Sequence, residues 1–262
     1  MTQGPLRIAR RSLRCRGARA RALLAAGGLL LLCGCTPRPL LERAIAARGG
    51  PLRGLVMSSE ARLYRGMPGT WRYTRTFLAP ERYAWQVETS TGTDTHLFDG
   101  QATRSFVDSG EVGRDTNPAA PLRTQARWTA VSLLDGLTAP NVVLYPLLPG
   151  ELPPGAREGL LATFPDGAAY RLGFDGQAQL VWMQGPLDLS PLASGQAQVR
   201  FGPARRSGHV LLPMTANWEI DGYRLADETL LAVCVDPPSL TAESFDAPAR
   251  LPRCPPAAAL PP

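Results

Sequence analysis

The spacing of apolar residues changes once along the sequence, close to residue 50. Between Leu40 and Arg48 apolar residues recur every three or four positions, and Gly49-Gly50 follows as a stop signal. This spacing predicts a short amphipathic helix. From Leu52 onward apolar and polar residues alternate, as in Tyr83 to Val87, where every second residue is large and apolar. A period of two predicts strands with one apolar face.

Turn signals and further alternating runs extend the strand prediction through most of the chain. Asp-Gly is a strong hairpin signal and occurs four times between strand-like runs, so successive strands are expected to be neighbours. The clearest strand is Val210 to Ile220, whose even-numbered residues are all apolar. Pro213 inside it favours an edge, a bulge or a bend. Further strands are predicted at 159–164, 168–174, 179–184, 196–201 and 224–235.

A second helix is expected between the two strand-rich regions. Pro121 to Leu137 carries an apolar stripe with helical spacing, and Pro140 lies just beyond its end. Residues 145–156, with four prolines and two glycines, read as a long loop. Strands, one helix and then strands again predict a mainly β, α+β domain of about 200 residues with an antiparallel sheet.

Composition and charge exclude several classes of protein. The 262 residues are 44% apolar, which is enough to fill a core, and five cysteines are too few for a disulfide-stapled miniprotein. The net charge of +6 comes from the first 34 residues, which hold seven arginines and no acid. Residues 35–262 then hold 21 arginines against 22 acids, so no nucleic-acid partner is expected.

The first 36 residues have the organisation of an export signal. The arginines are followed by eleven apolar or small residues, Ala22 to Leu32, a stretch too short to span a membrane. Leu32-Cys33-Gly34-Cys35 then resembles the lipobox of bacterial lipoproteins. The resemblance implies that residues 1–34 are a lipoprotein signal peptide and that Cys35 becomes the lipid-modified N-terminus. The alternative is an ordinary secreted protein with a fortuitous Cys-Gly-Cys sequence.

The same resemblance predicts where the protein resides. Residues 35–39 would form a lipidated tether, and the attached acyl chains, palmitate among them, would anchor the chain stably in a membrane. Thr36 is not the Asp that retains such lipoproteins in the inner membrane. The expected location is therefore the cell envelope, in the outer membrane and facing the periplasm.

Two cysteines remain in the processed chain besides Cys35, namely Cys234 and Cys254. A disulfide between them, in an oxidising compartment, would stabilise the fold by about 3 kcal/mol on the loop-entropy argument. Two other readings stay open. Cys234 can be a free buried cysteine between two valines, and the two cysteines can share a metal ion, which the lack of a nearby His disfavours.

The sequence offers little material for catalysis. Only His96 and His209 could act as imidazole bases or metal ligands, and no zinc-binding, nucleophile-elbow or phosphate-loop motif is present. Acid pairs such as Asp227-Glu228 occur, but adjacent acids on a strand point to opposite faces. No enzyme activity, cofactor or metal is therefore predicted, and a hydrolase using two carboxylates would need them about 5 to 9 Å apart in a cleft.

Large apolar side chains at alternating strand positions should converge on one face of the sheet. They can be core residues that the predicted helices cover completely. They can also line a partly filled cavity for an acyl chain or another apolar ligand. The candidates for such a cavity are Trp71, Tyr73, Tyr83, Trp85, Tyr170, Phe174, Trp182, Met214 and Trp218.

The order of these segments resembles the lipoprotein-carrier (LolA/LolB) superfamily and its outer-membrane lipoprotein relatives. Each segment has low specificity, and their order across residues 40–248 carries the resemblance. The segments are an Ala-rich helix ending in Gly49-Gly50, the strand Gly54 to Ala61, the turn and strand Ala79 to Trp85, the hairpin Leu97 to Gly100, and the closing segments Leu212-Pro213, Asp221 to Leu225 and Asp236 to Pro248.

The resemblance implies an incomplete antiparallel β-barrel, or curved sheet, with a few helices packed on its concave face. It further implies a half-barrel domain at residues 40–248, followed by a proline-rich tail at 249–262, and an apolar cavity that holds lipid or lipoprotein acyl chains without catalysis. A lipidated member would be closer to the anchored receptor than to the soluble carrier. The alternative is a non-enzymatic envelope lipoprotein with a fully packed core and an envelope protein as its partner.

Overall fold

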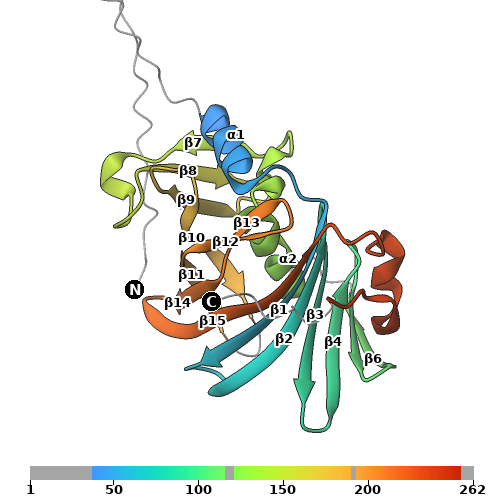
Figure 1. The fold of residues 1–262 in the computed structure, drawn as a ribbon. Coiled ribbons are helices and arrows are strands. Elements are labelled where there is room, and N and C mark those ends of the chain that lie inside the picture. The colour runs from blue at the N-terminus through green and yellow to red at the C-terminus, as the bar shows by residue number, and fades with distance from the viewer. Residues whose placement is uncertain (1–36, 116–120, 190–192, 255–262) are drawn as a thin grey trace, which may run out of the picture. The chain divides into compact units, whose positions relative to one another are not determined.

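The computed structural model describes residues 37–115, 121–189 and 193–254, and these residues form one compact unit (Figure 1). In these ranges the helices are α1 (Pro37–Arg48), α2 (Pro121–Ser132) and the short 3-10 helices η1 (Asp135–Thr138), η2 (Pro149–Glu151), η3 (Ala242–Asp246) and η4 (Pro248–Arg250). The strands are β1 (Gly54–Leu63), β2 (Gly69–Leu78), β3 (Arg82–Thr89), β4 (Gly92–Phe98), β5 (Thr103–Val107), β6 (Gly110–Asp115), β7 (Val143–Pro146), β8 (Glu158–Thr163), β9 (Ala169–Phe174), β10 (Leu180–Asp188), β11 (Ser194–Phe201), β12 (Ala204–Ser207), β13 (Val210–Pro213), β14 (Thr215–Ile220) and β15 (Tyr223–Val235).

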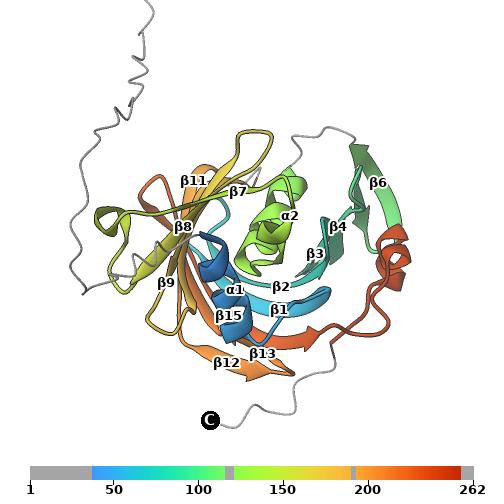
Figure 2. The same cartoon turned by 90° about the horizontal axis from the view of Figure 1, so that it is seen from above.

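One large antiparallel sheet dominates the described part of the chain. Its strand order is β6-β5-β4-β3-β2-β1-β15-β14-β11-β10-β9-β8-β7, and β12 pairs with β13 in a separate hairpin. The sheet curves around the two α-helices, but its edge strands β6 and β7 do not pair with each other (Figure 2). The predicted fold class, a curved open sheet with helices on its concave face, is confirmed.

The order of strands follows directly from the hairpins along the chain. Strands β1 to β6 form a meander, α2 follows, and a second meander runs from β7 to β11. The last strand, β15, then pairs with β14 on one side and with β1 on the other. Because β15 joins the two meanders, one continuous sheet results instead of two packed sheets.

Helix α2 separates two hydrophobic clusters on the concave face. Leu122 and Ala126 pack in a cluster with side chains of β1 to β4, whereas Trp128 and Val131 pack in a second cluster with side chains of β8 to β11. Helix α1 adds Leu40, Leu41 and Ala44 to the second cluster. No helix in the described ranges has the length and apolarity needed to cross a membrane.

The long strand predicted at Val210 to Ile220 is divided in two. Residues 210–213 pair with β12, and residues 215–220 join the main sheet as β14. The division falls at Met214, directly after Pro213, which has no N–H to continue a ladder. The second predicted helix is also shorter than expected, because Leu134 takes a left-handed backbone (φ 64°) after α2 ends at Ser132.

The chain beyond β15 packs on the convex face of the sheet. Leu240, Phe245 and Leu251 are buried there in a third cluster, against side chains that include Leu97 and Phe106. The side chain of Arg104 donates hydrogen bonds to the backbone carbonyls of residues 245 and 246. Cys254 is bonded to Cys234 of β15. The folded unit thus includes residues 249–254 of the segment predicted as a tail, and Pro37 and Pro39 of the predicted tether lie in α1.

Candidate functional site

A cavity of about 550 Å³ lies on the concave face of the sheet, beside α2. This volume is within the range of pockets that hold small-molecule ligands. Strands β1 to β4, β10, β11, β14 and β15 contribute its walls, together with α2, the end of α1 and the β13 region. The residues that line it include Ala44, Arg48, Met57, Ala61, Leu63, Met67, Trp71, Tyr73, Arg75, Tyr83, Trp85, Val87, Asp94, His96, Gln125, Trp128, Thr129, Leu133, Phe201, Leu212, Met214, Ala216, Trp218, Ala226, Glu228 and Leu230.

Strands β2 and β3 supply the aromatic wall of the cavity. The register pairs Tyr73 with Val87 and Arg75 with Trp85, so alternate residues of both strands face the same side. The rings of Tyr73 and Trp85 lie 6.3 Å apart between centroids, and both side chains are only half-buried. Six of the nine cavity candidates line this space: Trp71, Tyr73, Tyr83, Trp85, Met214 and Trp218.

The other three candidates, Tyr170, Phe174 and Trp182, do not line the cavity but pack in the β8 to β10 region. Tyr170 and Phe174 are at most 1% exposed. The ring of Tyr170 packs edge-on against Trp128 (5.8 Å) and Phe164 (5.6 Å). Gly185 makes room for it, since a Cβ there would lie 2.3 Å from the ring. Helices α1 and α2 pack over the concave side here and bury Tyr170 and Phe174. Trp182 lies on the other face, where its indole N–H donates to Gln198 Oε1 at 3.4 Å.

Trp128 of α2 forms the boundary between the packed region and the cavity. Its indole N–H donates a hydrogen bond to the Pro186 carbonyl (2.6 Å), which fixes the ring against β10. The ring contacts Tyr170 on the packed side and lies 5.3 Å from the Trp218 ring on the cavity side. One side chain of α2 therefore closes the core and lines the cavity.

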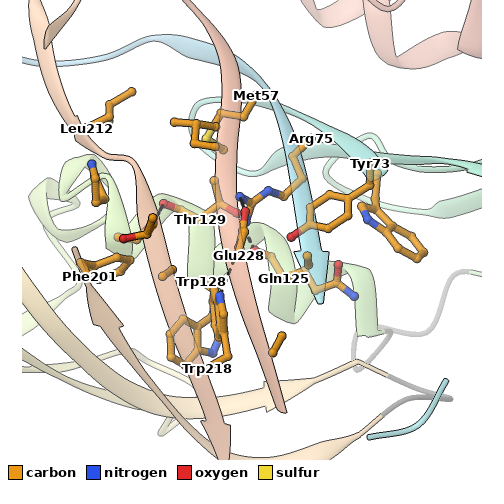
Figure 3. Close-up of a pocket in the computed structure, with 18 of the residues that line it drawn as sticks. Met57, Tyr73, Arg75, Gln125, Trp128, Thr129, Phe201, Leu212, Trp218 and Glu228 are labelled. Carbon is orange, nitrogen blue, oxygen red and sulfur yellow. Dashed lines mark hydrogen bonds and ion pairs between the residues drawn. The ribbon is translucent and has the colours of Figure 1, made fainter. Parts of the chain in front are cut away.

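A buried ion pair interrupts the apolar lining. Arg75 of β2 and Glu228 of β15 lie on either side of β1, and their side chains form a salt bridge across the concave face (Figure 3). The Trp218 indole N–H also donates to Glu228 Oε2 (3.1 Å), and Arg75 reaches Ser59 Oγ at 3.4 Å. The Glu228 carboxylate thus has partners on β2 and β14, and a buried charge needs such partners.

The pair shifts the proton affinities of its neighbours. Burial alone would lower the pKa of Arg75, but the charge of Glu228 raises the pKa above its ordinary value, so the guanidinium stays protonated. Burial and the Glu228 charge raise the pKa of Tyr73 well above its usual range. Burial raises the pKa of Tyr83 to about 12. Both phenols are therefore neutral hydrogen-bonding groups at neutral pH.

A second ion pair closes the cavity at the end of α1. Arg48 Nη2 lies 2.9 Å from Asp135 Oδ2, with both side chains largely buried, and it donates to the Gly50 carbonyl at 2.6 Å. Burial lowers the pKa of Arg48, an effect that the Asp135 charge opposes. This contact ties the end of α1 to η1, which follows α2. The positions of both helices over the sheet are thereby coupled.

His96 and the adjacent acids Asp227 and Glu228 make structural contacts. His96 stacks on Trp85 with centroids 5.6 Å apart, and its Nδ1 lies 2.9 Å from Ser105 Oγ. Of the adjacent acids, Glu228 faces the cavity, whereas Asp227 accepts hydrogen bonds from Tyr64 (2.7 Å) and Asn217 (2.9 Å) outside it. The two carboxylates point to opposite faces, as expected. Within the described ranges no three His, Cys, Asp or Glu side chains are placed to hold a metal.

Sequence reasoning did not find the ion pair, although a signal for it exists. Arg75 occupies an inward position of β2 between Tyr73 and Phe77, and Glu228 occupies one of β15 between Ala226 and Leu230. A single charge at an apolar position of an alternating strand indicates a buried partner of opposite sign. The pairing of Arg75 with Glu228 could not be predicted, because it depends on the contact between β1 and β15, two strands that are far apart in sequence.

Comparison with known proteins gives a likeness in fold alone. No protein-family profile and no curated protein match the sequence. Among solved structures, a LolA superfamily protein from Nitrosomonas europaea is similar over 80% of this chain and 97% of its own, with a TM-score of 0.50 and 11% identity. A DUF1329 family protein from Desulfovibrio piger covers 80% and 96%, with a TM-score of 0.50 and 9% identity.

At sequence identities this low, the similarity establishes the fold and not a function or a ligand. The fold expected from the LolA/LolB resemblance is confirmed, because the described strands and helices superpose on a LolA superfamily structure over nearly its whole length. The predicted lipidation site Cys35 and the predicted signal peptide lie outside the described residues.

Proposed function

We propose that this chain is a membrane-anchored envelope lipoprotein that binds, and passes on, a hydrophobic ligand such as a lipid or the acyl chain of a lipoprotein. The observation that carries the proposal is the cavity of about 550 Å³, in whose wall on β2 and β3 the rings of Tyr73 and Trp85 remain partly exposed. A fully packed core would bury these rings, as it buries Tyr170. Apolar walls with a few fixed polar groups are typical of ligand pockets.

The side chains that line the cavity suit binding better than catalysis. Its lining is apolar and aromatic apart from a few polar side chains, and the Arg75–Glu228 pair is already engaged with Ser59 and Trp218. A proton-transfer role would need a titratable group poised near neutral pH, whereas the pKa values of Tyr73 and Tyr83 are raised away from it. The cavity also contains His96, but burial lowers the pKa of that imidazole, which stacks on Trp85 and contacts Ser105. The proposed role is therefore ligand binding without chemistry.

The proposed location follows from the predicted lipid anchor. Acylated Cys35 would lie two residues before α1, which packs against the sheet. Placed in the outer membrane and facing the periplasm, the cavity would be available to ligands that arrive through the envelope. Replacement of Cys35 by Ala should abolish acyl labelling and membrane retention, and a variant that is still acylated would contradict the anchor.

The ligand is tested by native mass spectrometry and lipid extraction of exported chain starting at Thr36, with uptake of a fluorescent fatty acid as a second readout. Ala61→Phe should lower uptake about tenfold, because Ala61 lines the cavity and its enlargement fills ligand space. Ala169→Phe, at an exposed position of β9, is the matched control. A chain that carries no lipid and takes up no fatty acid would contradict the proposal and favour a pure interaction module.

A further inference from the structure

The two edges of the large sheet have opposite character. Strand β6 reads Gly-Glu-Val-Gly-Arg-Asp, is exposed along its length and carries three charges. Charges on an edge strand prevent unwanted pairing with other chains. Strand β7 reads Val-Leu-Tyr-Pro and continues as Leu147, Leu148 and Pro149, without a charge in seven residues. An edge strand that faces water is expected to carry charges, as β6 does. The uncharged, apolar edge at β7 is therefore expected to contact a partner surface.

Three side chains of this edge face away from the core, and we call them the β7 patch: Val143, Tyr145 and Leu148. They are 49%, 52% and 66% exposed, and they make up three of the eight exposed large hydrophobic residues in the described ranges. Leu161 of β8 lies opposite Tyr145 in the register and continues the patch along the sheet. Such clustering marks an interaction surface, because single exposed apolar residues are ordinarily scattered.

The β7 patch lies close to the point where the predicted anchor joins the fold. Helix α1 packs against β7 at the same end of the sheet (Figure 1). Arg43 of α1 forms an ion pair with Glu158 of β8 at 2.7 Å, which fixes the helix beside this edge. Cys35 is two residues before Pro37, so even an extended chain places it within about 7 Å of the start of α1.

We propose that the β7 patch is a membrane-contact surface that lies on the lipid bilayer beside acylated Cys35. The inference rests on the lipid anchor of the proposed function. Apolar side chains near an anchored N-terminus gain by entering the interface, and a tyrosine is well suited to that depth. A second protein strand is a poorer occupant, because Pro146 and Pro149 remove N–H donors along the edge. Two-point attachment would fix how the folded unit faces the membrane.

Vesicle binding of unacylated chain starting at Thr36 tests the patch alone. With phosphatidylcholine vesicles, the double variant Val143→Ser, Leu148→Ser should partition about tenfold more weakly than the parent. The matched control is Val107→Ser, Val112→Ser near the opposite edge, where the exposed fractions are 47% and 66% and partitioning should stay unchanged. Equal losses in both variants, or self-association of the parent through the patch in sedimentation, would overturn the proposal.

A tethered measurement covers the case in which the unacylated chain binds too weakly to detect. In chain starting at Cys35, whose other two cysteines are disulfide-bonded, the Cys35 thiol is coupled to a maleimide lipid in vesicles that also contain brominated phosphatidylcholine. The added fluorescence of Tyr145→Trp should be quenched, and that of Val112→Trp should not. No quenching at 145 overturns the proposal. Fatty-acid uptake should be intact in every patch variant, so failure of the cavity function is read separately.

Discussion

The two halves of the sheet have the same alternation of apolar and polar side chains, but one half forms a packed core and the other lines a cavity. In the β8 to β10 region, helices α1 and α2 cover the concave face, and Tyr170 and Phe174 are almost completely buried. In the β2 to β4 region α2 and the β13 hairpin cover only part of the face, and Tyr73 and Trp85 remain partly exposed around a cavity. The difference teaches that helix placement, and not strand pattern, decides whether an aromatic side chain becomes core or ligand surface.

The sharpest test of this comparison removes one aromatic from each half. Tyr170→Ala should lower the free energy of unfolding by about 4 kcal/mol, because it leaves a cavity in a close-packed region. Trp85→Ala should cost less, about 2 kcal/mol, since part of its ring is already exposed in the cavity, yet it should weaken fatty-acid uptake. Denaturant unfolding of both variants measures the costs. Equal costs would mean that the two halves are packed alike.

The ion pair tests whether the open half is held together by charge. Glu228→Leu leaves Arg75 buried without its partner and should lower the free energy of unfolding by about 3 kcal/mol. The double variant Arg75→Leu, Glu228→Leu should recover most of the loss, because no uncompensated charge remains. Thermal unfolding of the two variants gives the comparison. A double variant as unstable as the single one would show that the pair contributes more than charge neutralisation.

The disulfide links β15 to the C-terminal segment up to Cys254, which packs on the convex face of the half that holds the cavity. Replacing both Cys234 and Cys254 by Ser should lower the free energy of unfolding by about 2 to 3 kcal/mol, because the loop they close is only about 20 residues long. Hydrogen exchange should rise first at Leu251 and along β4 and β5, whose convex side the segment covers. Unchanged exchange there would mean that the segment is held by its apolar contacts alone.

The smallest expected effect is a pH dependence of the free energy of unfolding that comes from His96, in the half of the sheet that holds the cavity. Burial lowers the pKa of His96, so the unfolded chain binds a proton more readily than the folded one. Stability that is present above the unfolded pKa of about 6.5 should therefore fall as the pH falls through the folded pKa. His96→Gln should flatten this part of the profile in denaturant titrations between pH 8 and pH 5. A variant that keeps the full acid slope would assign it to carboxylates instead.

The sequence predicted the parts of the fold that depend on local pattern. Alternating residues and Asp-Gly turns predicted most strands and their hairpin neighbours, and the stripe around Leu122 and Ala126 predicted α2. The cavity was predicted only as one of two outcomes, because the pattern of Tyr73 is the same as that of Tyr170. Which of them is covered depends on where α1 lies, and α1 is held by long-range contacts such as those of Arg48 with Asp135 and Arg43 with Glu158.

The remaining differences also have long-range causes. Residues 249–254 look like a proline-rich tail in sequence, but Leu251 finds an apolar site on the convex face that no local pattern reveals. The split of the 210–220 run at Met214 needed the partner strands, since β13 pairs with β12 and β14 with β15. Pro213 indicated a break in the run but not two different sheets.

The pairing of β15 with β1 has a consequence for how this chain comes to be folded. Strand β1 is the first strand of the unit and β15 the last, and their ladder runs from Leu55 opposite Val235 to Leu63 opposite Ala226. Until residue 235 has emerged, the first meander ends in an unpaired strand rich in apolar residues, a species prone to aggregation. Such a topology is expected to fold slowly, because its closing contact joins the most distant strands of the unit. The first meander therefore acquires the partner of β1 only after every other strand of the unit has been made.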